Sequence, residues 1–326
     1  MKESLSVEEQ EKLLEERKKR FRILVCIDGS DESYQGLRYA AKMGQGDDAD
    51  IILFSVRPLD RGLSSGGLQL RVARENMLKW GLELPDIQYL KKGRDLLIEM
   101  GEMSEDWTEK ASHTDVEGDP LGDNKIEYRS TQGKKSIVLK LKTATSIAGG
   151  ILDQYELGPY NIIILGATNR WRGLVKSFWD PAVAEKVAVH APCSVLVARS
   201  LEIGHGHLIC TDGTERSMEA VRKDAVIAHR CGCPVSLISV ALDVESEPEA
   251  KDNVDRAAEM LGEMGIEVEE CIVRVGDPVE EIIDTGPDYS VIVLSDSSKS
   301  GLQRFFMGSV AFKVLEKAYN SVLIIR

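Results

Sequence analysis

The sequence predicts two tandem doubly wound α/β domains, each built on a five-stranded parallel sheet. The first observation is a repeat: Leu24–Ser30 and Leu208–Thr214 each end an apolar run at Asp-Gly followed by a hydroxyl residue. A second repeat matches Ala191–Arg199 with Ala318–Arg326, so the whole unit is duplicated. Thirdly, compact β-branched runs alternate with helical stretches, which is typical of a parallel sheet covered on both faces.

Residues 1–20 predict a charged surface helix ahead of the first domain. Ser6 and Glu9 form a capping-box pattern, and acidic residues early in the segment with Arg17–Arg20 late suit the helix dipole. Because its apolar face is thin, we expect a solvated lead-in helix, and a docking helix for a partner is the alternative.

The first domain is expected at residues 21–200. Short apolar runs rich in β-branched residues predict its strands. These runs are Ile23–Ile27, Ile51–Val56, Ile137–Leu141, Ile162–Leu165 and Val195–Ala198.

An insertion at about residues 90–136 separates the second and third of these strands and has no counterpart in the second domain. Its bulk, Gly101–Lys125, holds eight acidic residues against two basic ones, and Gly118–Pro120 would break any helix. We expect a mobile acidic loop on the surface, with a partner-binding element or lid as the alternative.

Residues 201–206 predict a linker, and residues 207–326 predict the second domain. Ser217–His229 and Pro248–Met264 are helical stretches between its strands. The expected strands are Leu208–Cys210, Val235–Val240, Val268–Val275, Val291–Leu294 and Val322–Ile325.

Composition excludes several classes of function. A chain of 326 residues with a formal net charge of −13 repels a phosphate backbone, so we expect no nucleic-acid partner. No apolar run is long enough for membrane insertion. The six cysteines form no disulfide framework, and Cys26, Cys193, Cys210 and Cys271 lie in apolar strand-like runs, so we expect a reducing cytoplasm.

Asp28 and Asp212 each follow the first strand of a repeat, at the sheet edge where α/β folds bind ligands. An aspartate there can accept hydrogen bonds from a ribose or a base. The alternative is purely structural, since Asp-Gly-Ser is also a common turn and helix-cap sequence.

A second candidate element, Ser295–Ser309, follows the fourth strand of the second domain and precedes an expected helix at Val310–Lys317. Small residues and a helix N-terminus together provide backbone N–H groups that can surround a phosphate, and Ser309 can add its hydroxyl. This pattern predicts a triphosphate site.

Both halves resemble universal stress proteins, and the resemblance covers the chain from about Phe21 to Arg326. It implies an adenine nucleotide alpha hydrolase-like fold and a possible ATP, ADP or AMP ligand. ATP-binding members carry Gly-x2-Gly-x9-Gly-Ser/Thr after the fourth strand and an Asp after the first. The matching positions in the second domain are Asp212, Val240, Ser295, Ser298, Gly308 and Ser309, with both leading glycines replaced by serine.

The first domain departs further from this pattern. Its corresponding residues are Asp28, Val56, Gly166 and Asn169, but Pro181-Ala182 stand where the family has Gly-Ser, with a spacing two residues too long. Proline lacks an N–H donor and alanine lacks a hydroxyl, so the resemblance implies a degenerate first site.

We therefore expect a cytoplasmic stress-response regulatory or interaction module that is not an enzyme, with no catalytic or metal-binding residues. An ATP/ADP-binding switch or slow ATPase that uses the second domain is the alternative. The resemblance implies that the two domains pair through their last strands, Ser194–Ala198 and Ser321–Ile325, whose apolar edges need cover. Further self-association and an unidentified protein partner stay open.

Overall fold

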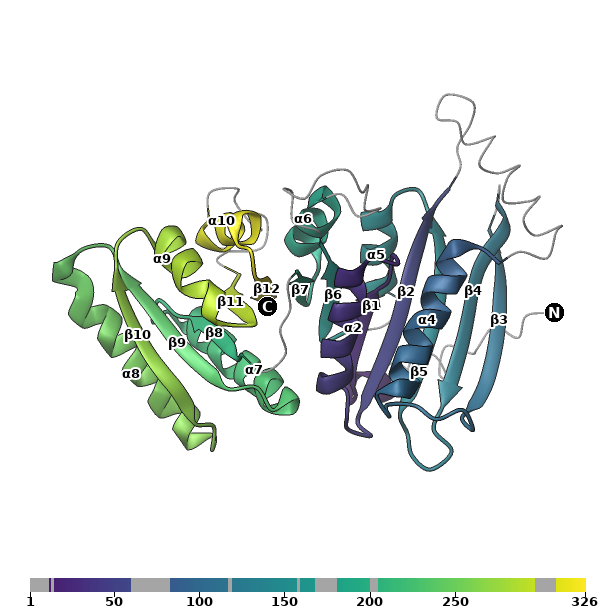
Figure 1. Ribbon diagram of the computed structural model, residues 1–326, viewed down its shortest axis with the longest axis horizontal. Coiled ribbons are helices and arrows are strands. Elements are labelled where there is room, and N and C mark those ends of the chain that lie inside the picture. Colours follow the sequence, from purple (N-terminus) through teal and green to yellow (C-terminus); the bar gives the residue numbers. More distant parts are fainter. Residues whose placement is uncertain are drawn as a thin grey trace, which may run out of the picture. The chain divides into compact units, whose positions relative to one another are not determined.

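Alternating strands and helices make up the part of the chain that the computed structural model describes: residues 12, 15–59, 83–116, 119–156, 159–167, 181–199, 205–296 and 309–326 (Figure 1). The chain divides into two compact units, residues 1–163 and 164–326. The boundary falls inside strand β6 (Ile162–Gly166). All ten predicted strands are present, which confirms the α/β class.

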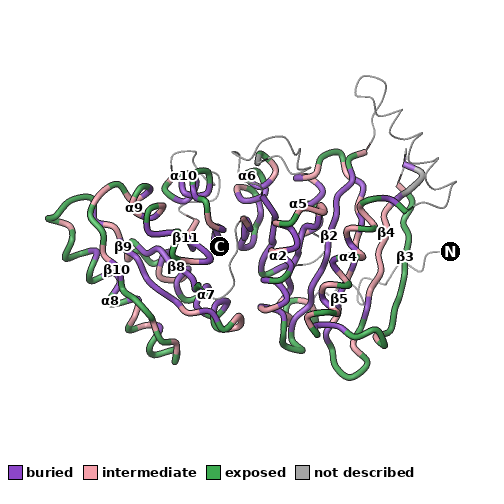
Figure 2. The backbone as a smooth tube through the Cα atoms, viewed as in Figure 1, coloured by how far each residue is buried: buried purple, intermediate pink, exposed green. Residues whose placement is uncertain are grey.

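The first unit is built on three neighbouring parallel strands, β1 (Phe21–Cys26), β2 (Ala49–Pro58) and β5 (Ser136–Ala144). β2 is the centre of this group, and all but its last residue are buried (Figure 2). In β5, buried and half-buried residues alternate, so Ile137, Leu139 and Leu141 share one face of the sheet.

The expected mobile acidic loop is wrong. The insertion folds into helix α4 (Pro85–Glu99) and an antiparallel hairpin, β3 (Thr108–Val116) and β4 (Asp119–Arg129). β4 pairs antiparallel with β5, so the first unit's sheet is mixed rather than purely parallel. β3 forms its edge and is exposed along nearly its whole length (Figure 2), so its two acidic residues, Glu109 and Asp115, stay in contact with water.

A buried ion pair joins the hairpin to the parallel strands of the sheet. Arg57 of β2 is only 2% exposed, and its Nη1 lies 2.9 Å from Oδ2 of Asp119 at the start of β4. Its Nη2 donates to Oγ1 of Thr143 on β5 at 2.8 Å. The acidic residue that suggested a loop therefore neutralises an arginine in the sheet.

Helices cover both faces of this sheet. α2 (Asp31–Met43) packs on β1, and α4 packs on β2 and β5. α5 (Ile147–Glu156) lies on the opposite face of the sheet. Its Gln154 accepts a hydrogen bond from Lys140 of β5. Side chains alternate along a strand, so Lys140 points away from the face on which Leu139 and Leu141 meet α4.

The second unit has the strand order β10-β9-β8-β11-β12-β7. Its helices pack in two pairs, α7 with α8 and α9 with α10. Its strands are β7 (Ser194–Ala198), β8 (His207–Cys210), β9 (Val235–Ala241), β10 (Val268–Val275), β11 (Val291–Ser295) and β12 (Ser321–Ile325). Its helices are α6 (Pro181–His190), α7 (Glu215–Cys231), α8 (Glu247–Glu263), α9 (Pro278–Thr285) and α10 (Val310–Lys317), with 3-10 turns at Val244–Ser246 and Gly286–Asp288.

The predicted pairing of the two last strands is confirmed. β7 and β12 run antiparallel, with Val322 opposite Val197 and Ile324 opposite Val195. Both strands are fully buried, so neither apolar edge is left open. Because β7 belongs to the second compact unit, this pairing lies inside that unit.

Three further expectations concern the terminal and linker segments, membrane spans and the cysteines. Most of the N-terminal segment and residues 201–204 of the linker lie outside the described residues, although residues 15–18 are helical. None of the helices in the described ranges is long and apolar enough to cross a membrane. Cys26, Cys193 and Cys210 are buried as expected, but Cys271 is exposed because β10 is an edge strand.

Candidate functional site

The strand order of the second unit reverses beside β8, which is where parallel sheets place a ligand crevice. Asp212 follows the end of β8, Val240 is the last residue but one of β9, and Ser295 ends β11. The register pairs β8 with β9 on one side and with β11 on the other, so these three residues share the carboxyl edge of the sheet.

Asp212 is exposed and its carboxylate organises the turn into α7. Its Oδ1 accepts hydrogen bonds from the backbone N–H of Thr214 at 3.1 Å and from the Thr214 hydroxyl at 2.6 Å. Thr214 in turn caps α7 by accepting from the Ser217 N–H. Desolvation raises the pKa of Asp212, but the hydrogen bonds from Thr214 and Ser217 outweigh it and lower the pKa below its usual value, so the group is an anionic acceptor at neutral pH.

Ser309 begins α10, as the sequence predicts. Its Oγ accepts from the Phe312 N–H at 3.2 Å, which makes it the helix N-cap. Its hydroxyl proton can still be donated to another acceptor. Two further candidates, Ser298 and Gly308, lie outside the described residues.

Helix α8 contributes two residues that sequence reasoning missed. A Cβ at Gly213, where φ is +74°, would collide with Oδ1 of Asn253 and Nη2 of Arg256. Arg256 donates to Asn253 at 2.7 Å. An amide and a guanidinium therefore stand beside the Asp212 turn. No local motif marks them, because only the packing of α8 brings them to the edge of β8.

The first-domain candidates are arranged differently. Asp28 repeats the cap geometry, since its Oδ1 accepts from the N–H and the hydroxyl of Ser30 at 2.9 and 2.5 Å. Val56 is 5% exposed in β2. Gly166 is the last residue of β6 and belongs to the second compact unit, and Asn169 lies outside the described residues.

An aromatic ring occupies the space above the Asp28 turn. A Cβ at Gly29, where φ is +84°, would lie 2.7 Å from Cε1 of Tyr89 on α4. The Tyr34 hydroxyl holds this part of α4 by donating to the backbone oxygen of Tyr89 at 3.2 Å. Ring carbons thus stand in the first domain where the second domain has an amide and a guanidinium.

Pro181 is the first residue of α6, the position that Val310 holds in α10. The connection from β6 to α6 is as long as the one from β11 to α10, but α6 has 10 residues and α10 has 8. The two extra residues that the motif comparison finds in the first domain therefore lengthen helix α6 and not the loop between β6 and α6.

Comparison with known families decides the identity of this arrangement. The sequence profile of the universal stress protein family matches residues 19–199 and again 207–326. The chain belongs to the universal stress protein family.

Relatives support the tandem architecture of this universal stress protein. A universal stress protein from Archaeoglobus fulgidus covers 94% of the chain with 98% of its own length, at 16% identity and a TM-score of 0.56. A putative one from Pseudomonas aeruginosa covers 95% with 94% of its own length, at 16% identity and a TM-score of 0.55. At these identities the likeness establishes the fold.

Shorter relatives match about one domain of this universal stress protein. A universal stress protein of Methanocaldococcus jannaschii is 26% identical over 137 residues, which are 36% of this chain and 80% of that protein. An Archaeoglobus fulgidus universal stress protein solved in complex with dAMP is 26% identical and covers 38% of this chain with 100% of its own length, at a TM-score of 0.32.

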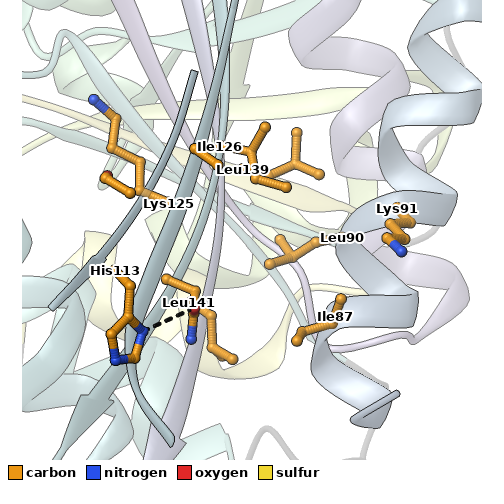
Figure 3. A pocket seen from close by; sticks show the side chains of 11 residues that line it. Ile87, Leu90, Lys91, His113, Lys125, Ile126, Leu139 and Leu141 are labelled. Carbon is orange, nitrogen blue, oxygen red and sulfur yellow. Dashed lines mark hydrogen bonds between the residues drawn. The ribbon is translucent and has the colours of Figure 1, made fainter. Parts of the chain in front are cut away.

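Helix α4 and strands β3, β4 and β5 of this universal stress protein line a cavity of about 390 Å³ (Figure 3). Figure 3 shows Leu90 of α4 facing Ile126 and Leu139 across it. At its mouth, Nδ1 of His113 lies 3.1 Å from Oδ1 of Asn124. Within the described ranges, no three His, Cys, Asp or Glu side chains are grouped to hold a metal ion.

Proposed function

We propose that this tandem universal stress protein is a stress-response regulatory module in which the second domain binds an adenine nucleotide and the first-domain site is degenerate. The role is binding and signalling to a protein partner rather than catalysis. The observation that carries the proposal is the difference between the two turns after β1 and β8, which share their cap geometry but not their surroundings.

The second domain offers matched polar groups for a nucleotide. The ionised Asp212 carboxylate is exposed at the ligand edge and suits the hydroxyls of a ribose. Ser309 stands at the N-terminus of α10, where backbone N–H groups and the helix dipole favour phosphate. Val240 supplies a half-buried apolar surface for the base, and Arg256, whose Nε pairs with Asp252 at 2.9 Å, brings guanidinium N–H donors near the turn.

The first domain lacks these features at the corresponding turn. The Tyr89 ring packs against Gly29, so a polar ligand group there would face aromatic carbon. Pro181 opens α6 without an N–H group to donate, whereas Val310 keeps one at the same position of α10. This change does not harm the fold, because proline is well accommodated at the first position of a helix.

The test is calorimetric titration of the full chain with ATP, ADP and AMP, after mass spectrometry of any small molecule released from the fresh protein. We expect binding to one site per chain. Asp212→Ala should weaken it at least tenfold, because a hydrogen bond to a charged group contributes about 1.5–3 kcal/mol. Asp28→Ala is the matched control, since it removes the same cap interaction in the first repeat.

Ser309→Ala removes a helix cap as well as a hydroxyl, so its affinity and thermal midpoint are compared with those of Ser30→Ala, which removes the cap of α2 in the first repeat. Equal loss of affinity in Asp28→Ala and Asp212→Ala would contradict the assignment to the second domain. Absence of heat at millimolar nucleotide would overturn nucleotide binding and leave the partner-binding role alone.

A further inference from the structure

A second cavity, which is lined by polar side chains, lies on the α5 face of the first unit's sheet, towards the amino ends of β1 and β2. We call it the amino-end cavity; its volume is about 940 Å³. The register places Arg22, Asp50 and Ser136 side by side across β1, β2 and β5, so their side chains share one face. Lys140 and Lys125 lie directly opposite each other on β5 and β4.

The lining of this cavity is positive in a chain whose net charge is −13. Eight cationic residues line it against five acidic ones. The cationic residues are Arg17, Lys19, Arg20, Arg22, Lys125, Arg129, Lys134 and Lys140; the acidic ones are Glu16, Asp47, Asp48, Asp50 and Glu127.

Three of these acids are already engaged by other groups. Asp50 accepts two hydrogen bonds of 2.7 Å from Arg20. Glu127 pairs with Lys125 and Arg129, each at 2.6 Å. Oδ1 of Asp47 accepts the backbone N–H groups of Lys134 and Lys135. Their charges are therefore directed to groups other than Lys140.

Lys140 is a half-buried cation whose hydrogen-bond partner carries no charge. Its Nζ donates to a neutral group, Oε1 of Gln154, at 2.7 Å. Like charges opposite each other across two strands are destabilising, and Lys125 occupies that position. Burial, followed by the neighbouring Lys142, lowers the pKa of Lys140 to about 8 and outweighs the opposing attraction of Asp123, so Lys140 is still mostly charged at neutral pH. Figure 3 shows Lys125 directed away from Leu90 of α4, towards this same face.

Arg22 is a second, independent indication of a ligand, because one of its buried N–H groups lacks a hydrogen-bond acceptor among the described residues. Its side chain is only 8% exposed, and its guanidinium stacks over the Tyr160 ring at 4.6 Å. Nη1 donates to the Pro159 oxygen, but among the described residues Nε is buried without a hydrogen-bond partner. The Asp50 carboxylate is 4.0 Å from it, beyond hydrogen-bonding distance.

We propose that the amino-end cavity binds a small, multiply charged phosphate-bearing anion, with Lys140 and Arg22 as its main contacts. Such an anion separates the charges of Lys140 and Lys125 and gives the Nε of Arg22 an acceptor. The site is distinct from the nucleotide edge, because Arg22 is the second residue of β1 whereas Asp28 follows that strand's carboxyl end. It does not depend on nucleotide binding by the second domain.

The experiment titrates full-length Asp212→Ala/Ser309→Ala protein with inorganic pyrophosphate at low salt, so that the proposed nucleotide site does not contribute. We expect one pyrophosphate site per chain, and at least a tenfold loss of affinity when Lys140→Gln is added. Lys251→Gln is the matched control, because it removes an equal charge from exposed α8 and should leave the affinity unchanged. Lys125→Gln is the second test variant and should weaken binding as well.

Thermal unfolding distinguishes a ligand site from a structural role. Pyrophosphate should raise the midpoint of the Lys251→Gln protein and leave that of the Lys140→Gln protein unchanged. Without pyrophosphate, Lys140→Gln should unfold at the same or a higher temperature, because a repelled buried charge is removed. Equal affinities in Lys140→Gln and Lys251→Gln, or no heat at millimolar pyrophosphate, would overturn the proposal.

Discussion

Replacing Asp224 by alanine will lower the free energy of unfolding by about 3–5 kcal/mol, the range for a broken buried ion pair. Nδ1 of His207 lies 2.8 Å from Oδ2 of Asp224, and both side chains are completely buried between β8 and α7. Without the carboxylate, a buried imidazole loses its charge partner in a medium of low dielectric. Urea denaturation of the full chain measures the change.

The duplicated sequence supplies the matched control for this prediction. In the first repeat, Ile23 of β1 and Ala40 of α2 take the places of His207 and Asp224, and both are fully buried. The double variant His207→Ile/Asp224→Ala should therefore regain most of the lost stability, because a packed apolar pair often replaces a buried ion pair without cost. If the double variant were as unstable as Asp224→Ala, the ion pair would not be the cause.

The same pair predicts a pH dependence. Burial alone lowers the pKa of His207, but the Asp224 carboxylate outweighs it and raises the pKa to about 9, from 6.5. A group whose pKa is raised by folding stabilises the fold below its unfolded pKa, so this contribution is complete below pH 6.5 and is lost as the pH rises through 9. It amounts to about 3 kcal/mol.

Unfolding experiments at pH 6 and pH 9.5 test the direction. The wild type should lose stability relative to His207→Ile/Asp224→Ala over this interval, and other titrating groups such as Lys140 cancel in the comparison. A constant difference between the two proteins at all pH values would show that His207 does not titrate in this window.

Arg326→Ala should cost about 3 kcal/mol or more, because it removes several charged hydrogen bonds at once. Nη1 of Arg326 donates to the Ala191 oxygen at 2.6 Å, Nη2 donates to the Ala188 oxygen, and Nε lies 3.0 Å from Oδ2 of Asp296. Arg326, which follows β12, thus satisfies the carbonyls at the end of α6.

Arg199 makes the reciprocal contacts. It follows β7 and donates to the oxygens of Leu315 and Ala318 at the end of α10. Burial lowers the pKa of Arg199 to about 10, so it stays charged at neutral pH. The backbone repeats the exchange, since the N–H of Arg199 donates to the Ser321 hydroxyl at 3.0 Å and that of Arg326 to the Ser194 hydroxyl at 3.3 Å.

Arg199→Ala should therefore cost about as much as Arg326→Ala in urea denaturation. Lysine at either position should fail to restore the stability, because it lacks the planar fork that reaches two carbonyls. Arg222→Ala is the matched control: this arginine is exposed on α7 and pairs with Glu219 in the same helix, so its loss should cost about 0.5 kcal/mol at most. A comparable effect of Arg222→Ala and Arg326→Ala would contradict the capping role.

The sequence by itself determined the class of fold, the duplication and the positions of the ten main strands along the chain. These follow from local patterns, because apolar runs of strand length and the Asp-Gly-hydroxyl turns are read from neighbouring residues. The same is true of the caps at Ser30, Thr214 and Ser309, each of which bonds a backbone N–H three residues later. The family motif marked Asp212 and Ser309 for the same reason.

The tertiary structure alone decided the features that depend on residues far apart in the chain. The acidic insertion forms a hairpin in which Asp119 finds a buried partner, Arg57, 62 positions away in sequence. His207, Arg199 and Arg326 look like ordinary polar residues until folding places them against Asp224 and the helix ends. Tyr89 and Arg256 distinguish the two turns only through the packing of α4 and α8, since such contacts leave no periodic or local signal in the sequence.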